Sequence, residues 1–135
     1  MKANLLQLPF AALAAVSLTL LTGCSSLSTE TIQYLGVPRQ APTDWQQVEI
    51  LQSLPDRPHT KLGEVVASVS LNPSPKVEKV EKAMRRKAAA LGADAVALIR
   101  DQVEVTGSFM SGPYWSPHVS PIRDRVIVGV AIKYE

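Results

Sequence analysis

The apolar run near the N-terminus is the feature that most constrains what this chain can fold into. Lys2 precedes the run Leu8–Leu21, and the small residues Thr22-Gly23 then lead to Cys24. A basic start, a short apolar core and small residues at the exit are typical of a secretory signal. The alternative, a retained transmembrane helix, needs about 20 apolar residues, more than this run offers. We therefore expect residues 1–23 to be a signal peptide that contributes nothing to the fold.

The end of this segment contains the only cysteine of the chain. Leu21-Thr22-Gly23-Cys24 resembles the lipobox of bacterial lipoproteins, a leucine and two small residues before cysteine. The resemblance implies cleavage between Gly23 and Cys24 and a diacylglyceryl group on the Cys24 sulfur, which would anchor the protein in a membrane. Ser25, rather than aspartate, follows the cysteine, and in a didermal bacterium this implies sorting to the outer membrane. We expect a lipid-anchored envelope protein whose domain faces the periplasm.

The mature chain is short and nearly neutral. Removal of residues 1–23 leaves 112 residues, with 13 Lys+Arg against 12 Asp+Glu and no cysteine besides Cys24. This length suits one modest domain, and the charge gives no indication of nucleic-acid binding. Residues 24–44 are rich in Ser, Thr and Pro, so we expect a lipidated N-terminus and tether followed by a single domain over 45–135. Apolar residues such as Ile32 and Tyr34 leave open whether part of the tether docks on the domain.

Hydrophobic periodicity predicts a small α+β domain. Alternating or continuous apolar residues predict strands, and residues at three- and four-residue steps predict a helix. The expected order is ββαββ, with a small antiparallel or mixed sheet of about four strands and one helix packed on one face. The expected strands are 45–53, 61–71, 94–105 and 125–134, and the expected helix lies within 72–92.

The helix shows the clearest local signals. Asn72 or Ser74 is expected to cap its start, Pro73 and Pro75 suit a first turn, and Gly92 suits the left-handed position after its end. The apolar stripe consists of Val77, Val80, Met84, Ala88 and Leu91. The basic run Arg85, Arg86 and Lys87 is interpreted as a solvated face, with an anionic lipid or polymer as the alternative ligand.

Two glycines within expected strands predict special geometry. Gly63, near the start of the second strand, predicts a β-bulge or a close backbone approach. Gly129, in the last strand, predicts a close approach of the helix or of a neighbouring chain. The sheet face away from the helix also carries apolar residues, Val66, Ile99 and Ile127, which suggests a dimer, a docked tether or another subunit.

Three segments together resemble known small domains: VEILQSLPDRPHTKLGEV, KAAALGADAVALI and VIVGVAIKY. They are similar to the YbjQ-like α+β domains and to the related RcsF-like lipoprotein domains, over roughly residues 46–134. The RcsF-like resemblance implies a sensor of envelope stress. Those domains contain disulfides, however, and the mature chain offers only Cys24, so no signalling residue is carried over.

The YbjQ-like resemblance implies heavy-metal binding or assembly into rings. Soft heavy metals require clustered Cys or His ligands. The two histidines, His59 and His118, lie far apart in the sequence, each close to prolines. We therefore expect no metal site within one chain, and the only version considered is a ring of His118 side chains at a subunit axis.

The stretch Thr106–Pro121 is the strongest candidate for a binding element. This Gly-, Ser- and Pro-rich connection contains Phe109, Tyr114 and Trp115, half of the six aromatic residues of the mature chain. A 16-residue loop is long for a hairpin, and large aromatic side chains anchor interfaces. The alternative is that the rings fold back as a lid over the open sheet face.

Catalytic chemistry has little support in the sequence. No nucleophile motif or phosphate-binding glycine loop is present, Asp94 suits a turn, and Asp101 and Glu104 lie on a strand where they are expected to face solvent. We therefore expect a non-enzymatic protein without a cofactor, acting as an interaction or stress-sensing module that binds another envelope protein. The alternatives are a structural homo-oligomer and, third, metal binding at His118.

Overall fold

The computed structural model of the chain describes residues 27–135. The signal peptide, the cleavage position at Gly23 and the lipidation position at Cys24 lie outside the described residues. The elements in chain order are β1 (Leu27–Gln33), β2 (Glu49–Leu51), β3 (His59–Ser70), α2 (Val77–Ala90), β4 (Ala95–Ser111) and β5 (His118–Tyr134). Over residues 27–135, no helix has the length and apolar character needed to cross a membrane.

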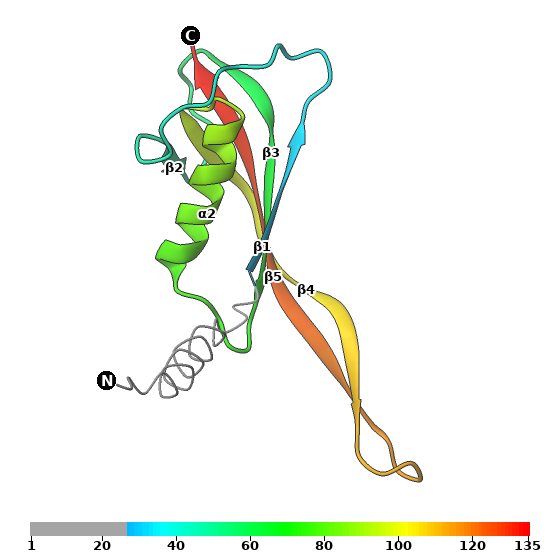
Figure 1. The fold of residues 1–135 in the computed structure, drawn as a ribbon. Helices are drawn as coiled ribbons and strands as arrows, with labels where there is room; N and C mark the ends of the chain where they lie inside the picture. The colour runs from blue at the N-terminus through cyan, green and yellow to red at the C-terminus, as the bar shows by residue number, and fades with distance from the viewer. Residues whose placement is uncertain (1–26) are drawn as a thin grey trace, which may run out of the picture.

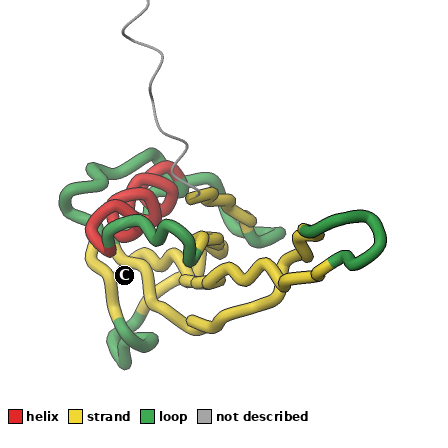
Figure 2. The backbone as a smooth tube through the Cα atoms, turned by 90° about the horizontal axis from the view of Figure 1, so that it is seen from below, coloured by secondary structure: helices red, strands yellow, loops and turns green. Residues whose placement is uncertain are grey.

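The five strands form one mixed sheet in the order β1-β3-β5-β4-β2, with α2 on one face (Figures 1 and 2). All neighbouring pairs are antiparallel except β2 and β4, which are parallel. The α+β class and the single covering helix are confirmed. The expected number of four strands is wrong, because the described residues contain a fifth strand that precedes the expected domain.

This additional strand, β1, corrects the predicted tether. Leu27 to Gln33 pair with β3 in seven register positions, and the Tyr34 amide then donates to the Leu62 carbonyl at 3.0 Å. Thr43 continues the attachment, since its hydroxyl donates to the Ala93 carbonyl at 2.6 Å. An edge strand needs apolar contact on only part of one face, so a Ser- and Thr-rich segment can supply it. The sheet therefore includes Leu27–Gln33, which precede the expected start of the domain at residue 45.

The expected strand over 45–53 is much shorter in the structure. Only Glu49–Leu51 pair with β4, because a turn occupies the preceding residues: the amides of Gln46 and Gln47 donate to the side chain and carbonyl of Asp44, both at 3.0 Å. Trp45, which precedes the strand, lies instead against α2. Lys82 and Arg86 lie 5.2 and 5.1 Å from its ring centroid.

The helix begins later than its prolines suggested. Lys76 is the N-cap residue, and its side chain makes no capping hydrogen bond, so the predicted cap at Asn72 or Ser74 is wrong. The first helical hydrogen bonds are accepted by the Lys76 carbonyl, from the Lys79 amide at 3.0 Å and the Val80 amide at 3.3 Å. The other end is as expected: Gly92 follows the helix with φ +82°.

The main core lies between α2 and the sheet. Its buried residues include Val65, Val96 and Ala131 from the strands and Met84 from the helix. Gly129 permits this packing, as predicted, because a Cβ there would lie 2.4 Å from Cγ1 of Val96 and 3.2 Å from Cε of Met84. Gly63 lies at a bulge in the β3–β5 register, which confirms the second glycine prediction.

On the opposite face of the sheet, the buried residues among those that the structure describes lie at the end that holds the C-terminus. Ala95, Val130 and Ile132 form a second buried cluster there, against Tyr34 and Leu51. The Tyr34 hydroxyl donates to Oε1 of Glu64 at 2.8 Å. Burial raises the pKa of the Tyr34 hydroxyl, and this hydrogen bond to a carboxylate raises it further. Part of the predicted tether thus covers the back of the sheet, which is one of the alternatives left open by the sequence.

Candidate binding surface

A two-stranded arm projects from the sheet beyond the part that α2 covers (Figures 1 and 2). The last position that β3 contributes is Ser70, paired with Asp124 of β5. From there β4 and β5 pair only with each other, as far as Ser111 and His118. We call residues 105–123, from the first of these two-strand pairs around the turn, the arm.

The arm corrects the prediction of a 16-residue loop over Thr106–Pro121. Both strands continue through most of that stretch, and only residues 112–117 connect them. The turn is closed by a hydrogen bond from the Ser116 amide to the Pro113 carbonyl at 2.9 Å, and Gly112 has φ +96°. Gly, Ser and Pro suggested a loop, but Phe, Met and Val between them pair well across two strands.

The aromatic side chains of the arm are exposed and do not fold back onto the sheet. Tyr114 is 98% exposed and Trp115 85% exposed, and Phe109 on β4 is 60% exposed. The lid alternative is therefore wrong. The exposed large apolar residues of the arm are Val105, Phe109, Met110, Tyr114, Trp115, Val119 and Ile122.

Charge is distributed unevenly between the arm and its base. Residues 105–123 contain no Asp, Glu or Lys, and their only arginine is Arg123, at the base. The adjoining part of the sheet is richly charged, with Arg100, Asp101 and Glu104 on β4. A solvated hairpin normally carries charges along its length, so an apolar arm without carboxylates or lysines is a candidate contact surface.

An ion pair links the two strands just above the arm. The Arg125 guanidinium donates to both carboxylate oxygens of Asp101, with Nε–Oδ1 at 2.6 Å. These hydrogen bonds hold the pKa of Asp101 below its ordinary value and raise the pKa of Arg125. Asp101 thus faces solvent, as expected, but is paired. Both side chains remain about 40% exposed, so the pair contributes at most about 1 kcal/mol to stability.

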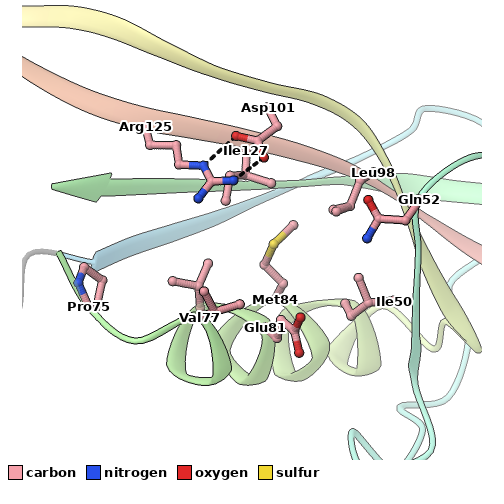
Figure 3. Close-up of a pocket in the computed structure, with 11 residues that line it drawn as sticks. Ile50, Gln52, Pro75, Val77, Glu81, Met84, Leu98, Asp101, Arg125 and Ile127 are labelled. Atoms are coloured by element: carbon pink, nitrogen blue, oxygen red, sulfur yellow. Dashed lines mark hydrogen bonds and ion pairs between the residues drawn. The ribbon is translucent and has the colours of Figure 1, made fainter. Parts of the chain in front are cut away.

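A cavity of about 190 Å³ lies beside this ion pair, between the first half of α2 and strands β4 and β5 (Figure 3). Val77 and Met84 of the helix and Leu98 and Ile127 of the sheet make most of its wall apolar. Both carboxylates of its lining have a basic partner: Asp101 is bonded to Arg125, and Glu81 lies 4.0 Å from the Arg85 guanidinium. The cavity is therefore a mostly apolar gap at the place where helix and sheet diverge.

The acidic residue and the two histidines considered from the sequence do not lie together at one site. Asp94 lies in the turn after α2, as expected, and its carboxylate accepts from the Tyr134 amide of β5 at 3.0 Å. His59 pairs with Tyr134, at one end of β5, whereas His118 begins the other end of the same strand. Sixteen residues of strand separate those ends, about 50 Å. Over residues 27–135, no three His, Cys, Asp or Glu side chains are grouped closely enough to hold a metal ion.

The outer edge of β4 is a feature that the sequence did not reveal. β2 pairs with only Ala95, Val96 and Ala97, so within the described residues no strand lies beside Leu98–Ser111 on that edge. Unpaired backbone groups on a long strand form a template for another strand. The sequence did not predict the length of β4, because the glycine- and serine-rich residues at its end suggested a loop rather than an extended strand.

Comparison with known proteins gives little further information. No family model matches the chain, and no curated protein matches it. Among solved structures, the chain is similar to the Francisella virulence factor FvfA, in its orthorhombic crystal form. The identity is 16% and the TM-score 0.48, and the similar region covers 78% of this chain and 96% of FvfA. Because the identity and the TM-score are both low, we draw no conclusion about function from this similarity.

Proposed function

We propose that the protein is a lipid-anchored envelope protein, held in the outer membrane through Cys24, that acts as a non-catalytic interaction module. The observation that carries this proposal is the arm, with its seven exposed apolar side chains and its open strand edges. A two-stranded hairpin by itself is at best marginally stable in water. Contact with a partner would cover its apolar residues.

The unpaired edge of β4 is the part of this surface best suited to another protein. A partner strand can add to Leu98–Ser111 through main-chain hydrogen bonds, while side chains such as Val103 and Phe109 select the partner. Val103 is 55% exposed beside charged neighbours of both signs. An apolar centre within a polar rim is the usual composition of a protein interface. We propose another envelope protein as the partner, and a role in sensing envelope stress follows from the RcsF-like resemblance.

Self-association is the second candidate, because the same edge can pair with its own copy. Two β4 edges in antiparallel register would join two sheets into one, with the same surface on both subunits. The experiment that separates the candidates is the solution mass of residues 25–135, measured by light scattering at several concentrations. A stable multimer that Val103→Asp dissociates supports self-association. A monomer at all concentrations supports a different partner.

A photo-cross-linking residue then tests the partner surface in intact envelopes. Placed at Val103, it is expected to give one adduct of defined mass, which Phe109→Ser weakens. Placed at Lys87, an exposed position on α2, it is expected to give none. Equal labelling from both positions would contradict a specific interface at β4.

The anchor is tested separately. Cys24→Ser is expected to abolish incorporation of labelled fatty acid and to release the protein from membranes. Ser25→Asp is expected to move the lipidated protein from the outer to the inner membrane, while Ser26→Asp serves as a control of equal charge. Fatty-acid incorporation that survives Cys24→Ser would contradict the lipobox interpretation.

A further inference from the structure

The start of the described chain and the arm lie at the same end of the sheet body. β1 and β5 are both antiparallel to β3, so they run in the same direction. Leu27 pairs with Val69, and Val69 pairs with Arg125, two residues from the base of the arm. From this level the body extends one way, along β1, and the arm extends the other way (Figure 1).

The proposed lipid anchor fixes which side faces the membrane. Two residues lie between Cys24 and Leu27, so the Cα atoms of Cys24 and Leu27 are three residue steps and at most about 11 Å apart. The body extends about 20 Å from Leu27 along β1. If the arm pointed away from the bilayer, the body would point toward it. The body is longer than the reach of the anchor and would then overlap with the membrane. The arm therefore lies on the membrane side of the domain, a step that rests on the proposed lipidation of Cys24.

The composition of the arm matches that position. Residues 105–123 themselves contain no carboxylate and no lysine, and hydroxyl groups supply most of their polarity. Tyr114 and Trp115, the most exposed of its large apolar side chains, are in the turn at the tip. Tyrosine and tryptophan are the residue types that concentrate at the membrane–water interface, where one part of the ring is apolar and another can bind water.

We infer that the arm docks on the surface of the bilayer that holds the lipid anchor, with Tyr114 and Trp115 in the interfacial region. The strands run about 23 Å from the level of Arg125 to His118, twice the reach of the anchor. An arm pointing straight at the membrane would enter the hydrocarbon, where its unpaired strand edges would have no hydrogen-bond partners. The arm is therefore tilted toward the plane of the bilayer, so that its tip reaches the interfacial region without entering the hydrocarbon. In this position β4 keeps an edge open to a protein partner.

Tryptophan fluorescence of the full lipidated mature protein tests this inference. The protein is reconstituted into vesicles of phosphatidylethanolamine and phosphatidylglycerol, with or without lipids brominated near the glycerol end of the acyl chain. The difference between wild type and Trp115→Phe isolates the emission of Trp115, and Trp45, which lies against α2, is the internal reference. Flotation of the vesicles reports anchoring independently of the arm.

The expected result is quenching and a blue shift of the Trp115 emission in brominated vesicles, with Trp45 unaffected. Ser116→Glu, which places a charge at the tip, is expected to reduce the quenching, whereas Ser53→Glu, in an exposed loop of the body, is not. An unquenched Trp115 in protein that floats with the vesicles overturns the inference but leaves the anchor intact. Cross-linking of the tip to a protein, without quenching by lipid, also overturns it. Failure to float overturns the proposed anchoring and, with it, this inference.

Discussion

Truncation of a side chain is expected to affect the free energy of unfolding very differently at the buried back of the sheet and at the exposed tip of the arm. Ile132 is fully buried between the strands and the residues behind them, whereas the Trp115 ring is 85% exposed. Ile132→Ala removes three carbon groups, worth about 0.8 kcal/mol each in transfer from water, and leaves a cavity. We therefore expect a loss of about 2–5 kcal/mol in the free energy of unfolding. Trp115→Ala, although it removes many more atoms, is expected to change it by less than about 0.5 kcal/mol.

Urea unfolding of residues 25–135, followed by circular dichroism, measures both changes. The comparison is valid if the dependence of the free energy on urea is the same in both variants and in wild type. Trp115→Phe serves as a control that keeps an aromatic ring at the tip. A loss of more than about 1 kcal/mol for Trp115→Ala would refute the reasoning, because it would show that the ring packs against the domain in solution.

Three further substitutions test other parts of the structure. Gly129→Ala is expected to lower the free energy of unfolding by about 1–3 kcal/mol through the clash of its Cβ with Val96, measured by urea unfolding. The pKa of Asp101 is lowered in the folded state, so its contribution is present above the unfolded pKa, about 4, and is lost as the pH falls through the folded value. Asp101→Asn should flatten the loss of thermal stability in acid by at most about 1 kcal/mol; an unchanged acid profile would contradict a role for its pair with Arg125. The pKa of Tyr34 is raised, so stability is lost above about pH 10, and Tyr34→Phe should reduce this alkaline loss in the same assay.

The central part of the fold could be predicted because local and global signals agree there. The apolar alternation of β3, the stripe on α2 and the glycine after the helix each require one structure, and the structure has it. Gly63 and Gly129 were predicted to allow close approach because a strand rarely contains glycine without such a reason. These positions depend on short-range geometry or on burial, both of which are visible in the order of residues.

The two ends of the sheet could not be predicted because composition there disagrees with pairing. β1 consists mainly of Ser, Thr and Glu, and it is held by the partner strand rather than by burial. The arm contains Gly, Ser and Pro, yet cross-strand pairing keeps it extended. Strand order is also set by tertiary contact alone, and the parallel β2–β4 pair has no signature in three residues. The apolar Ile32 and Tyr34 were the one signal of the N-terminal strand.

The register of β1 has a consequence for how the domain would respond to mechanical force. Seven paired positions join Leu27–Gln33 to β3, and the proposed anchor pulls on the Leu27 end. Hydrogen bonds in an antiparallel pair lie across the strands, so tension along β1 loads them all at once in shear. A pull at right angles would instead open them one after another, as in unzipping. Because β1 joins the proposed lipid anchor to the sheet, the force needed to detach β1 would depend on the direction of the pull.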